Sequence, residues 1–209
     1  MPSKYRLRYV FKPVIQALSR PLAKIGISAN VATLIMLFHS IVSFVFLVFL
    51  ENLILFGIFV FLTGIWDGLD GAIARVNKKS GEFGGFFDSF MDRISEFVIF
   101  TALLLYFWEE VLWNSIDMKL VVFIMLMASI MISYSRARAE TISDGDFDIG
   151  LMARSERLFY LFLTMSLSYF IGYEKYFIFL FMILVSLTAL YRGIKIYSII
   201  KHESHNELG

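Results

Sequence analysis

Long apolar runs, separated by short polar connections, make up most of this chain. Each run is about 20 residues long, which is the length that an α-helix needs to cross a hydrocarbon layer roughly 30 Å thick. None of the runs alternates polar and apolar residues at period two, as the strands of a membrane barrel would. The pattern therefore predicts an all-α membrane protein with six transmembrane helices. These helices are expected at residues 31–50, 53–74, 83–108, 120–139, 158–172 and 176–200.

The segment before the first run has a different pattern. Residues 3–24 contain six Lys and Arg side chains mixed with apolar ones, which is typical of an amphipathic helix in the membrane interface. Such a helix can set the topology of the chain or bind lipid headgroups, and the sequence leaves both roles open. The expected organisation is an interfacial segment at 1–27, a six-helix membrane domain at 28–200 and a polar tail at 201–209.

Composition and charge indicate that the chain lies in a membrane and how it is oriented there. Hydrophobic residues make up 58% of the chain, more than a water-soluble domain of this size can bury. All Lys and Arg residues except Lys119 and Lys175 fall in segments that six spans would place on one side of the membrane. Because cytoplasmic segments carry the excess of Lys and Arg, we expect a multi-pass protein of the cell membrane with both termini in the cytoplasm.

Four aspartates interrupt the ends of the second and third runs. Asp67 and Asp70 lie in the second run, and Asp88 and Asp92 lie in the third. Ionisable side chains at membrane depth are costly and are usually functional. If the two runs form a helical hairpin, the two pairs face each other near the cytoplasmic end. Carboxylates without His or Cys nearby select a hard divalent cation, so the expected cofactor is Mg²⁺ or Mn²⁺, with two ions shared by the four acids.

Small residues and one arginine share the helical stripes of these acids. Gly71, Ala74 and Arg75 continue the stripe of the second run, and Gly84 lies one turn before the acids of the third. Small side chains let an extended ligand approach the backbone, and Arg75 can neutralise a phosphate beside the cations. Any one glycine is better explained by close helix packing, whereas the whole constellation indicates a binding site.

The stretch that carries these residues resembles a family signature. It reads Asp-x2-Asp-Gly-x2-Ala-Arg-x8-Gly-x3-Asp-x3-Asp from Asp67 to Asp92, which is similar to the signature of the CDP-alcohol phosphotransferases. The string Ser-Ala-Asn-Val-Ala-Thr at 28–33 resembles the family's entry to its first membrane helix, with Ala29 in place of the usual proline. The resemblance implies a six-helix membrane enzyme that is generally a homodimer.

The resemblance also implies a reaction and residue roles. In this family, an alcohol hydroxyl attacks the β-phosphate of a CDP-linked lipid, and CMP is released. By position, Asp67, Asp70 and Asp88 would hold metal, and Asp92 would combine metal binding with the role of general base. The residues alone do not choose between Asp88 and Asp92 as that base. The residues expected to bind the CDP-linked lipid are Asn30, Val31, Ala32, Thr33, Gly71, Ala74, Arg75, Gly81 and Gly84.

Four arginines near the cytoplasmic ends of the last three runs are candidates for binding the acceptor. They are Arg136, Arg154, Arg157 and Arg192. Singly, each is explained as well by a topology cation paired with a nearby acid, but together they suggest a pocket for the phosphate of an anionic acceptor. The strings around the first three resemble the branch of the family that makes phosphatidylinositol phosphate and archaetidylinositol phosphate, which implies inositol phosphate as acceptor. Glycerol phosphate is the nearest alternative, because it also carries a phosphate.

A divalent-cation transporter is the competing class of protein. Ion pathways also use intramembrane carboxylates, but they distribute them across the bilayer or repeat them in inverted halves. This chain shows neither arrangement. We therefore expect a transferase of substituted phosphate groups in phospholipid biosynthesis. Its expected partners are a CDP-linked lipid, a polyol-phosphate acceptor, the lipid bilayer and a second copy of the chain, with no nucleic acid.

Overall fold

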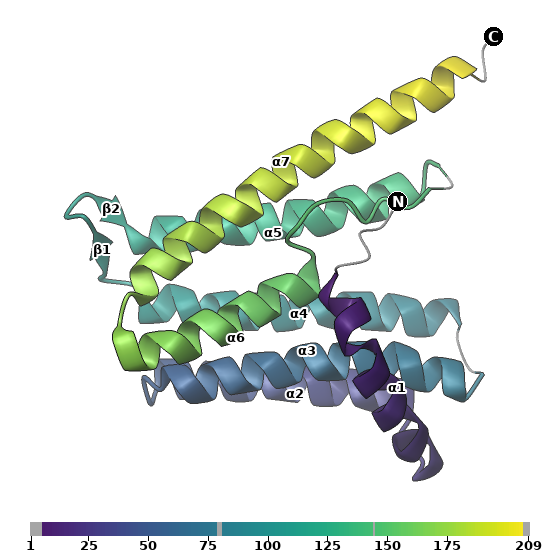
Figure 1. The fold of residues 1–209 in the computed structure, drawn as a ribbon, viewed down its shortest axis with the longest axis horizontal. Helices are drawn as coiled ribbons and strands as arrows, with labels where there is room; N and C mark the ends of the chain where they lie inside the picture. The colour runs from purple at the N-terminus through teal and green to yellow at the C-terminus, as the bar shows by residue number, and fades with distance from the viewer. Residues whose placement is uncertain (1–5, 79–80, 144, 207–209) are drawn as a thin grey trace.

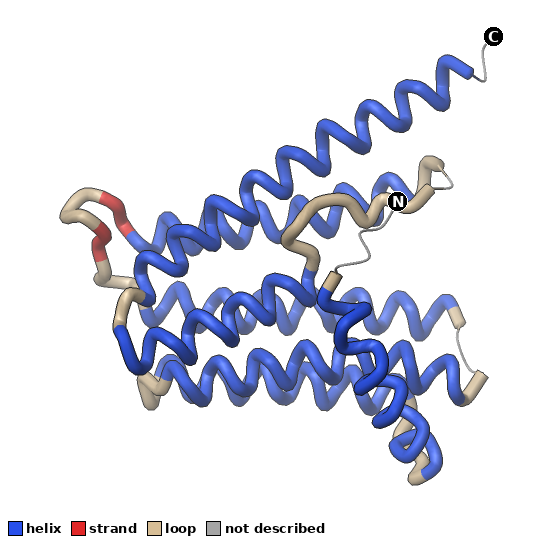
Figure 2. The backbone as a smooth tube through the Cα atoms, viewed as in Figure 1, coloured by secondary structure: helices blue, strands red, loops and turns tan. Residues whose placement is uncertain are grey.

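Helices account for most of the described structure (Figure 1, Figure 2). The computed structural model describes residues 6–78, 81–143 and 145–206. Its helices are α1 (Leu7–Lys24), α2 (Ala29–Val48), α3 (Leu53–Val76), α4 (Glu82–Tyr106), α5 (Met118–Glu140), α6 (Arg154–Ile171) and α7 (Glu174–Asn206). A short antiparallel hairpin of β1 (Val111–Leu112) and β2 (Ile116–Asp117) joins α4 to α5. The helical class expected from the sequence is confirmed.

The six apolar runs correspond one to one to α2–α7, with ends shifted by less than two turns. Four of these helices, α2, α3, α5 and α7, are long and apolar enough to cross a membrane by length and composition. The other two, α4 and α6, are 25 and 18 residues long. These two helices are less apolar because they carry some of the acids and arginines that line the cavity described below. The chain is a multi-pass membrane protein.

The last helix and the hairpin differ from expectation. α7 runs to Asn206, so residues 201–206, predicted as part of the polar tail, continue the helix (Figure 1). No Pro or Gly stands between Gly193 and the end of α7, so the local sequence contains no strong helix breaker. The hairpin turns at Trp113 and Asn114, whose φ angles of 51° and 55° are left-handed. Strands of two residues are too short to show an alternating polar and apolar pattern, so the sequence did not predict this hairpin.

The apolar core fills one half of the bundle. Many of its members lie in the parts of the helices near the hairpin, such as Phe56, Leu103, Met125 and Phe181, and the cluster reaches Ile132 and Leu158 beside the cavity. α2 packs on α3 and α4, α6 lies against α3, and α7 packs mainly on α5 (Figure 1). The opposite half of the bundle carries the polar side chains, so the cavity lies at the end away from the hairpin.

Helix α1 crosses the bundle at that polar end (Figure 1). It packs on α3, where a side chain at Gly68 would meet Ile15 at 3.3 Å. Phe11 contacts the rings of Phe61 on α3 and Phe159 on α6, with centroids 5.7 Å and 6.1 Å away. These contacts fix the N-terminal helix beside the cavity.

Gly57 is expected to control how closely α3 packs on α6. A Cβ atom there would lie 2.6 Å from Ser166 Oγ and 3.0 Å from the carbonyl oxygen of Phe162. The serine can rotate, but the backbone oxygen moves only if α6 shifts. Gly57→Ala should therefore lower the free energy of unfolding by about 1–3 kcal/mol, measured as a lower Tm in detergent. Gly193→Ala is the control, because nothing lies within 4 Å of a Cβ there. An unchanged Tm in Gly57→Ala would contradict this packing argument.

Candidate functional site

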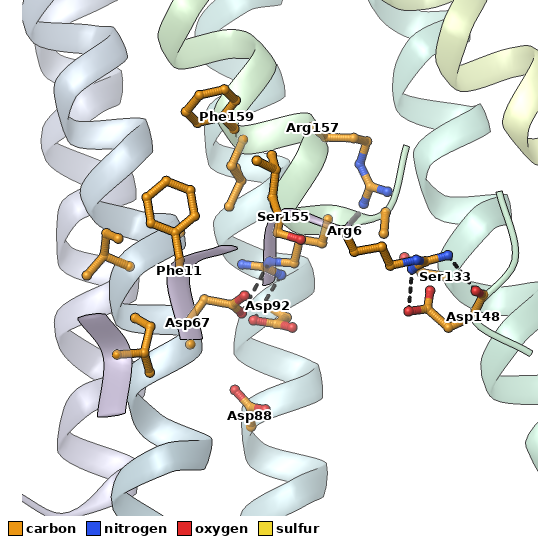
Figure 3. Close-up of a pocket in the computed structure, with 18 of the residues that line it drawn as sticks. Arg6, Phe11, Asp67, Asp88, Asp92, Ser133, Asp148, Ser155, Arg157 and Phe159 are labelled. Atoms are coloured by element: carbon orange, nitrogen blue, oxygen red, sulfur yellow. Dashed lines mark hydrogen bonds and ion pairs between the residues drawn. The ribbon is translucent and has the colours of Figure 1, made fainter. Parts of the chain in front are cut away.

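A cavity of about 950 Å³ opens at the polar end of the bundle (Figure 3). Its wall is built from α1, α3, α4, α5, α6, α7 and the connection between α5 and α6. One part of the wall is apolar and includes Phe11, Phe61 and Phe159. The rest carries aspartates on α3 and α4, and arginines on most of the other elements. The cavity therefore offers both a surface for hydrocarbon and a surface for charged groups.

Three aspartates form the acidic centre of this cavity. Asp67 on α3 and Asp88 and Asp92 on α4 each offer one carboxylate oxygen, and these oxygens all lie within 4.8 Å of one another. Asp88 Oδ1 is buried and has no hydrogen-bond partner among the described residues. A donor set of carboxylate oxygens with such an unsatisfied atom fits a hard divalent cation. These three residues can therefore hold a divalent metal ion.

Asp70, predicted as the fourth member, lies outside this group of three. Its side chain is turned toward α2, where Thr33 Oγ1 lies 3.1 Å from Asp70 Oδ2. Its other oxygen accepts a hydrogen bond of 2.5 Å from the backbone N–H of Gly71. Asp70 is 3% exposed, and its side chain lies within hydrogen-bonding reach of Asp88 on α4. The structure thus clusters three of the four predicted acids, and it places Asp70 beside Asp88 with a further contact to α2.

Arg154 supplies the positive charge that balances the acidic centre. Its Nη1 lies 2.9 Å from Asp92 Oδ1, and its Nε lies 3.4 Å from Asp67 Oδ1. Its Nη2 donates a hydrogen bond of 2.7 Å to Ser95 Oγ. The sequence placed Arg154 in the acceptor pocket, and the structure places it among the acids. The physical reason is that clustered buried carboxylates require a cation close by.

Arg157 is fully engaged by protein groups. Its Nε and Nη2 donate to Glu96 Oε1 at 2.9 Å and 2.5 Å, and its Nη1 donates to the carbonyl oxygen of Met152 at 2.9 Å. The arginine is 1% exposed, and Glu96 is 5% exposed. This buried ion pair fixes α6 against α4, the helix that carries two of the three clustered acids. In this arrangement its guanidinium positions the two helices.

The two remaining predicted arginines differ from each other in exposure. The side chain of Arg136 is 42% exposed, and its Nε donates to Glu140 Oε1 at 2.7 Å. Arg192 is 2% exposed, and its guanidinium donates to the carbonyl oxygens of Ile149 and Ile132 at 2.5 Å and 2.9 Å. Both line the cavity. Of the four predicted acceptor arginines, Arg136 therefore presents the most accessible guanidinium.

Residues predicted to bind the CDP-linked lipid lie on three elements. Arg75 lines the cavity on α3, and a Cβ atom at Gly71 would lie 3.4 Å from its Nη1. Space is open within 4 Å of the Cβ positions of Gly81 and Gly84, at the start of α4. Asn30, Val31, Ala32 and Thr33 form the first turns of α2, and Ala74 lies near the end of α3. Their contacts with a ligand stay a prediction.

Arg6 and Asp148 are among the charged residues that line the cavity and were not predicted as site residues. Arg6 precedes α1, and Asp148 lies in the connection between α5 and α6. They form a buried ion pair, with side chains 7% and 4% exposed. Arg6 looked like one of several interfacial cations, and Asp148 like one of several loop acids. No local pattern marks either residue, because their partners are distant in the sequence.

The fold and site define a class: a helical membrane protein whose cavity joins a carboxylate centre, cationic side chains and an apolar wall. Such a cavity fits a phosphate-bearing lipid with a divalent cation. The sequence model of the CDP-alcohol phosphatidyltransferase family matches residues 27–197. The chain belongs to this family of membrane enzymes.

Individual relatives and solved structures agree with this family assignment. The chain is 36% identical over 160 residues to archaetidylinositol phosphate synthase of Pyrococcus horikoshii, covering 76% of this chain and 80% of the relative. It superposes with a TM-score of 0.74 on the crystal structure of Mycobacterium tuberculosis phosphatidylinositol phosphate synthase with CDP-DAG bound, at 26% identity. That match covers 88% of this chain and 94% of the other. The same enzyme in complex with manganese and citrate matches with a TM-score of 0.73 at 25% identity, covering 88% of each chain.

Proposed function

We propose that this enzyme transfers the lipid phosphoryl group of a CDP-linked lipid to a hydroxyl of inositol phosphate and releases CMP. The observation that carries the proposal is one cavity in which the acidic centre, the arginines and the apolar wall are combined. The names of similar proteins support it, since they are synthases of archaetidylinositol phosphate and phosphatidylinositol phosphate. The proposed place of the reaction is phospholipid biosynthesis.

The acidic centre would hold the divalent cations. Asp67, Asp88 and Asp92 are the proposed ligands, with Asp70 completing the set, and the proposed ions are two of Mg²⁺ or Mn²⁺. When bound, such ions offset the negative charge of the attacked phosphate and of the departing CMP. Manganese in a crystal structure of a similar enzyme supports a divalent cation here. Arg75 would neutralise a further phosphate oxygen at the wall of the cavity.

Asp92 is the proposed general base. An alcohol is a weak nucleophile at neutral pH, so a carboxylate must accept its proton as the new P–O bond forms. Asp92 lies on the side of α4 that faces α6, and its Oδ1 contacts Arg154. Asp92 lines the same cavity as Arg136, Arg157 and Arg192. Asp88 lies one turn nearer the start of α4 and would serve as a ligand.

The proposed arrangement in the membrane follows from the charges and the helices. All six helices α2–α7 would span the bilayer, and α1 would lie in its cytoplasmic interface. The proposed units are the segment 1–27, the membrane domain 28–200 and the C-terminal residues 201–209. Both termini and the cavity would face the cytoplasm, as the excess of Lys and Arg at that end supports. The proposed assembly is a homodimer, with the resemblance to the family as its support.

Acceptor choice provides the direct test of the proposed function. Purified protein is incubated with a CDP-linked lipid, Mg²⁺ and one acceptor, and CMP release is measured. We expect turnover with inositol phosphate and little with free inositol or serine, because cationic side chains in the cavity favour an anionic acceptor. Turnover with glycerol phosphate alone would assign the second candidate acceptor. Turnover with serine or free inositol alone would contradict the arginine pocket.

A further inference from the structure

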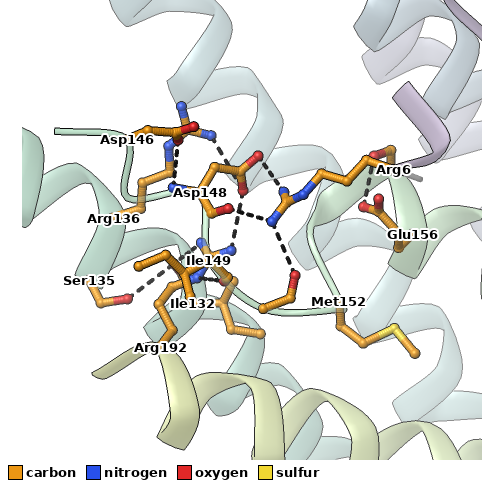
Figure 4. A network of polar contacts seen from close by, with 12 residues as sticks. Arg6, Ile132, Ser135, Arg136, Asp146, Asp148, Ile149, Met152, Glu156 and Arg192 are labelled. Carbon is orange, nitrogen blue, oxygen red and sulfur yellow. Dashed lines mark hydrogen bonds and ion pairs between the residues drawn. The ribbon is translucent and has the colours of Figure 1, made fainter. Parts of the chain in front are cut away.

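Asp148 joins three segments that are distant in the sequence (Figure 4). It lies in the connection between α5 and α6, and its side chain is 4% exposed. Its carboxylate forms an ion pair with Arg6, which precedes α1, and another of 3.3 Å with Nη2 of Arg192 on α7. Nη1 of Arg136 on α5 lies 3.9 Å away. Three guanidinium groups therefore converge on one buried carboxylate.

The same arginines also bind the backbone of this connection. Arg6 Nη2 donates to the carbonyl oxygens of Asp148 and Gly150 at 2.5 Å and 3.1 Å. Arg192 Nε donates to the intervening carbonyl oxygen, that of Ile149, at 2.5 Å. Three successive carbonyl groups are thus held by two side chains. Charge-assisted hydrogen bonds of this kind are about twice as strong as neutral ones.

The path of the connection is tight as well. Gly150 has a φ of 102°, in the left-handed region that favours glycine. A Cβ atom at Gly150 would lie 2.6 Å from Thr188 Cγ2 on α7. The N–H of Leu7 donates to Glu156 Oε1 on α6 at 3.3 Å, next to the ion pair. The N-terminal segment is therefore attached at two adjacent points.

This network forms part of the cavity wall. Arg6, Asp148, Arg136 and Arg192 all line the cavity that contains the acidic centre. Figure 3 shows the pair of Arg6 and Asp148 across the cavity from Asp67 and Asp92. On the proposed function, this is the side on which the phosphate of the acceptor would bind.

We infer that Arg6 and Asp148 are a positioning pair for the acceptor. This inference rests on the proposed function. The pair holds the connection between α5 and α6 as a wall of the acceptor pocket, and Asp148 orients Arg192 beside Arg136. The N-terminal segment thereby contributes to the site through Arg6. A cation that served only topology or headgroup binding would be exposed at the interface, whereas Arg6 is 7% exposed and committed to Asp148 and two carbonyl groups.

The inference is tested with Arg6→Gln, Asp148→Asn, the double variant and Arg20→Gln. Asn and Gln keep hydrogen-bonding capacity and remove charge, and Arg20 is an exposed cation on α1. We expect each single change in the pair to raise KM for inositol phosphate about tenfold, which is within the coupling range of contacting charged residues. KM for the CDP-linked lipid should change less than twofold, and Arg20→Gln should leave KM for inositol phosphate unchanged.

Two outcomes of these kinetics would overturn the inference. The double variant should be no worse than the worse single variant, because both changes break the same interaction. If the two effects multiply instead, the residues act independently. If KM for the CDP-linked lipid rises as much as that for inositol phosphate, the pair does not act on the acceptor side.

Hydrogen exchange separates this inference from the proposed function. Arg6→Gln should speed amide exchange in residues 145–153, whereas Arg20→Gln should not. This measurement needs no turnover, so it also serves if Asp148→Asn does not fold. If amide exchange in residues 145–153 is unchanged in Arg6→Gln, the pair of Arg6 and Asp148 does not hold this connection, even if inositol phosphate is the acceptor. If exchange is faster in Arg6→Gln but the protein does not use inositol phosphate, the pair still holds the connection between α5 and α6. In that case the proposed function is rejected, and so is the role of the pair in binding the acceptor.

Discussion

Asp92→Asn is expected to lower CMP release by about 10²–10⁴-fold, the contribution typical of general base catalysis. The amide keeps the shape of the side chain but cannot accept the proton of the acceptor hydroxyl. Because Asp92 also belongs to the acidic centre, the assay is run across a range of Mg²⁺ or Mn²⁺ concentrations. The expected result is a rate that stays low when the metal is saturating. Initial rates with CDP-linked lipid and inositol phosphate measure it.

The metal series distinguishes a base from a ligand. If Asp92 served only to bind metal, saturating metal would restore the rate of Asp92→Asn, and the proposed base would be wrong. Asp88→Asn provides the comparison, because its effect should be partly recovered at high metal. Glu82→Gln is the control, since it removes an exposed carboxylate from the first turn of the same helix. Its rate should match that of the unaltered protein.

The helices could be predicted because hydrophobic length is a local property of the sequence. A run of about 20 apolar residues has few other stable structures, since backbone groups in lipid need internal hydrogen bonds. The ends were less predictable, and α7 shows why. Its polar residues 201–206 carry no helix breaker, so the helix continues past the apolar run. Polarity marks where a helix leaves the hydrocarbon and does not mark where it ends.

The acidic centre was predicted in outline, and the direction of Asp70 at its edge has a geometric cause. With 3.6 residues per turn, side chains four apart differ in direction by roughly 40°, and side chains three apart by roughly 60° in the opposite sense. Asp88 and Asp92 are four apart and point into the same group. Asp67 and Asp70 are three apart, and Asp70 is directed to Thr33 on α2. Residues on one helical stripe therefore point in slightly different directions, and Asp70 lies at the edge of the group next to Asp88.

The partners of Arg6 and Arg157 could not be predicted, because they depend on tertiary packing. Arg6 and Asp148 are separated by 142 positions, and Arg157 and Glu96 by 61. Nothing in the local sequence distinguishes these arginines from topology cations such as Arg20. Burial distinguishes them, and burial follows from how α1 and the α5–α6 connection pack on the bundle. The pairs of Arg136 with Glu140 and of Arg192 with Asp148 agree with the alternative that each arginine pairs with a nearby acid, whereas the partners of Arg6 and Arg157 were not predicted.

Arg154→Gln is expected to tighten metal binding about tenfold or more, the second large effect. In the structure, the guanidinium of Arg154 contacts Asp67 and Asp92, two of the three acids that would bind a cation. A metal ion entering this centre competes with Arg154 for the same oxygens. Removing one partner of a buried ion pair leaves uncompensated charge, so a divalent cation gains more by binding the variant. Calorimetric titration of Mn²⁺ into detergent-solubilised protein measures the dissociation constant.

Arg136→Gln provides the matched control for this titration. It removes a guanidinium from the same cavity, but Arg136 pairs with Glu140 and Asp148 and is not a partner of the acidic centre. Its Mn²⁺ affinity should stay within twofold of that of the unaltered protein, because an exposed charge at greater distance is screened. The rise of Tm on adding Mn²⁺ should likewise be largest in Arg154→Gln, since a tighter ligand stabilises the folded state more. Equal or weaker Mn²⁺ binding in Arg154→Gln would show that Arg154 supports the bound cation and does not compete with it.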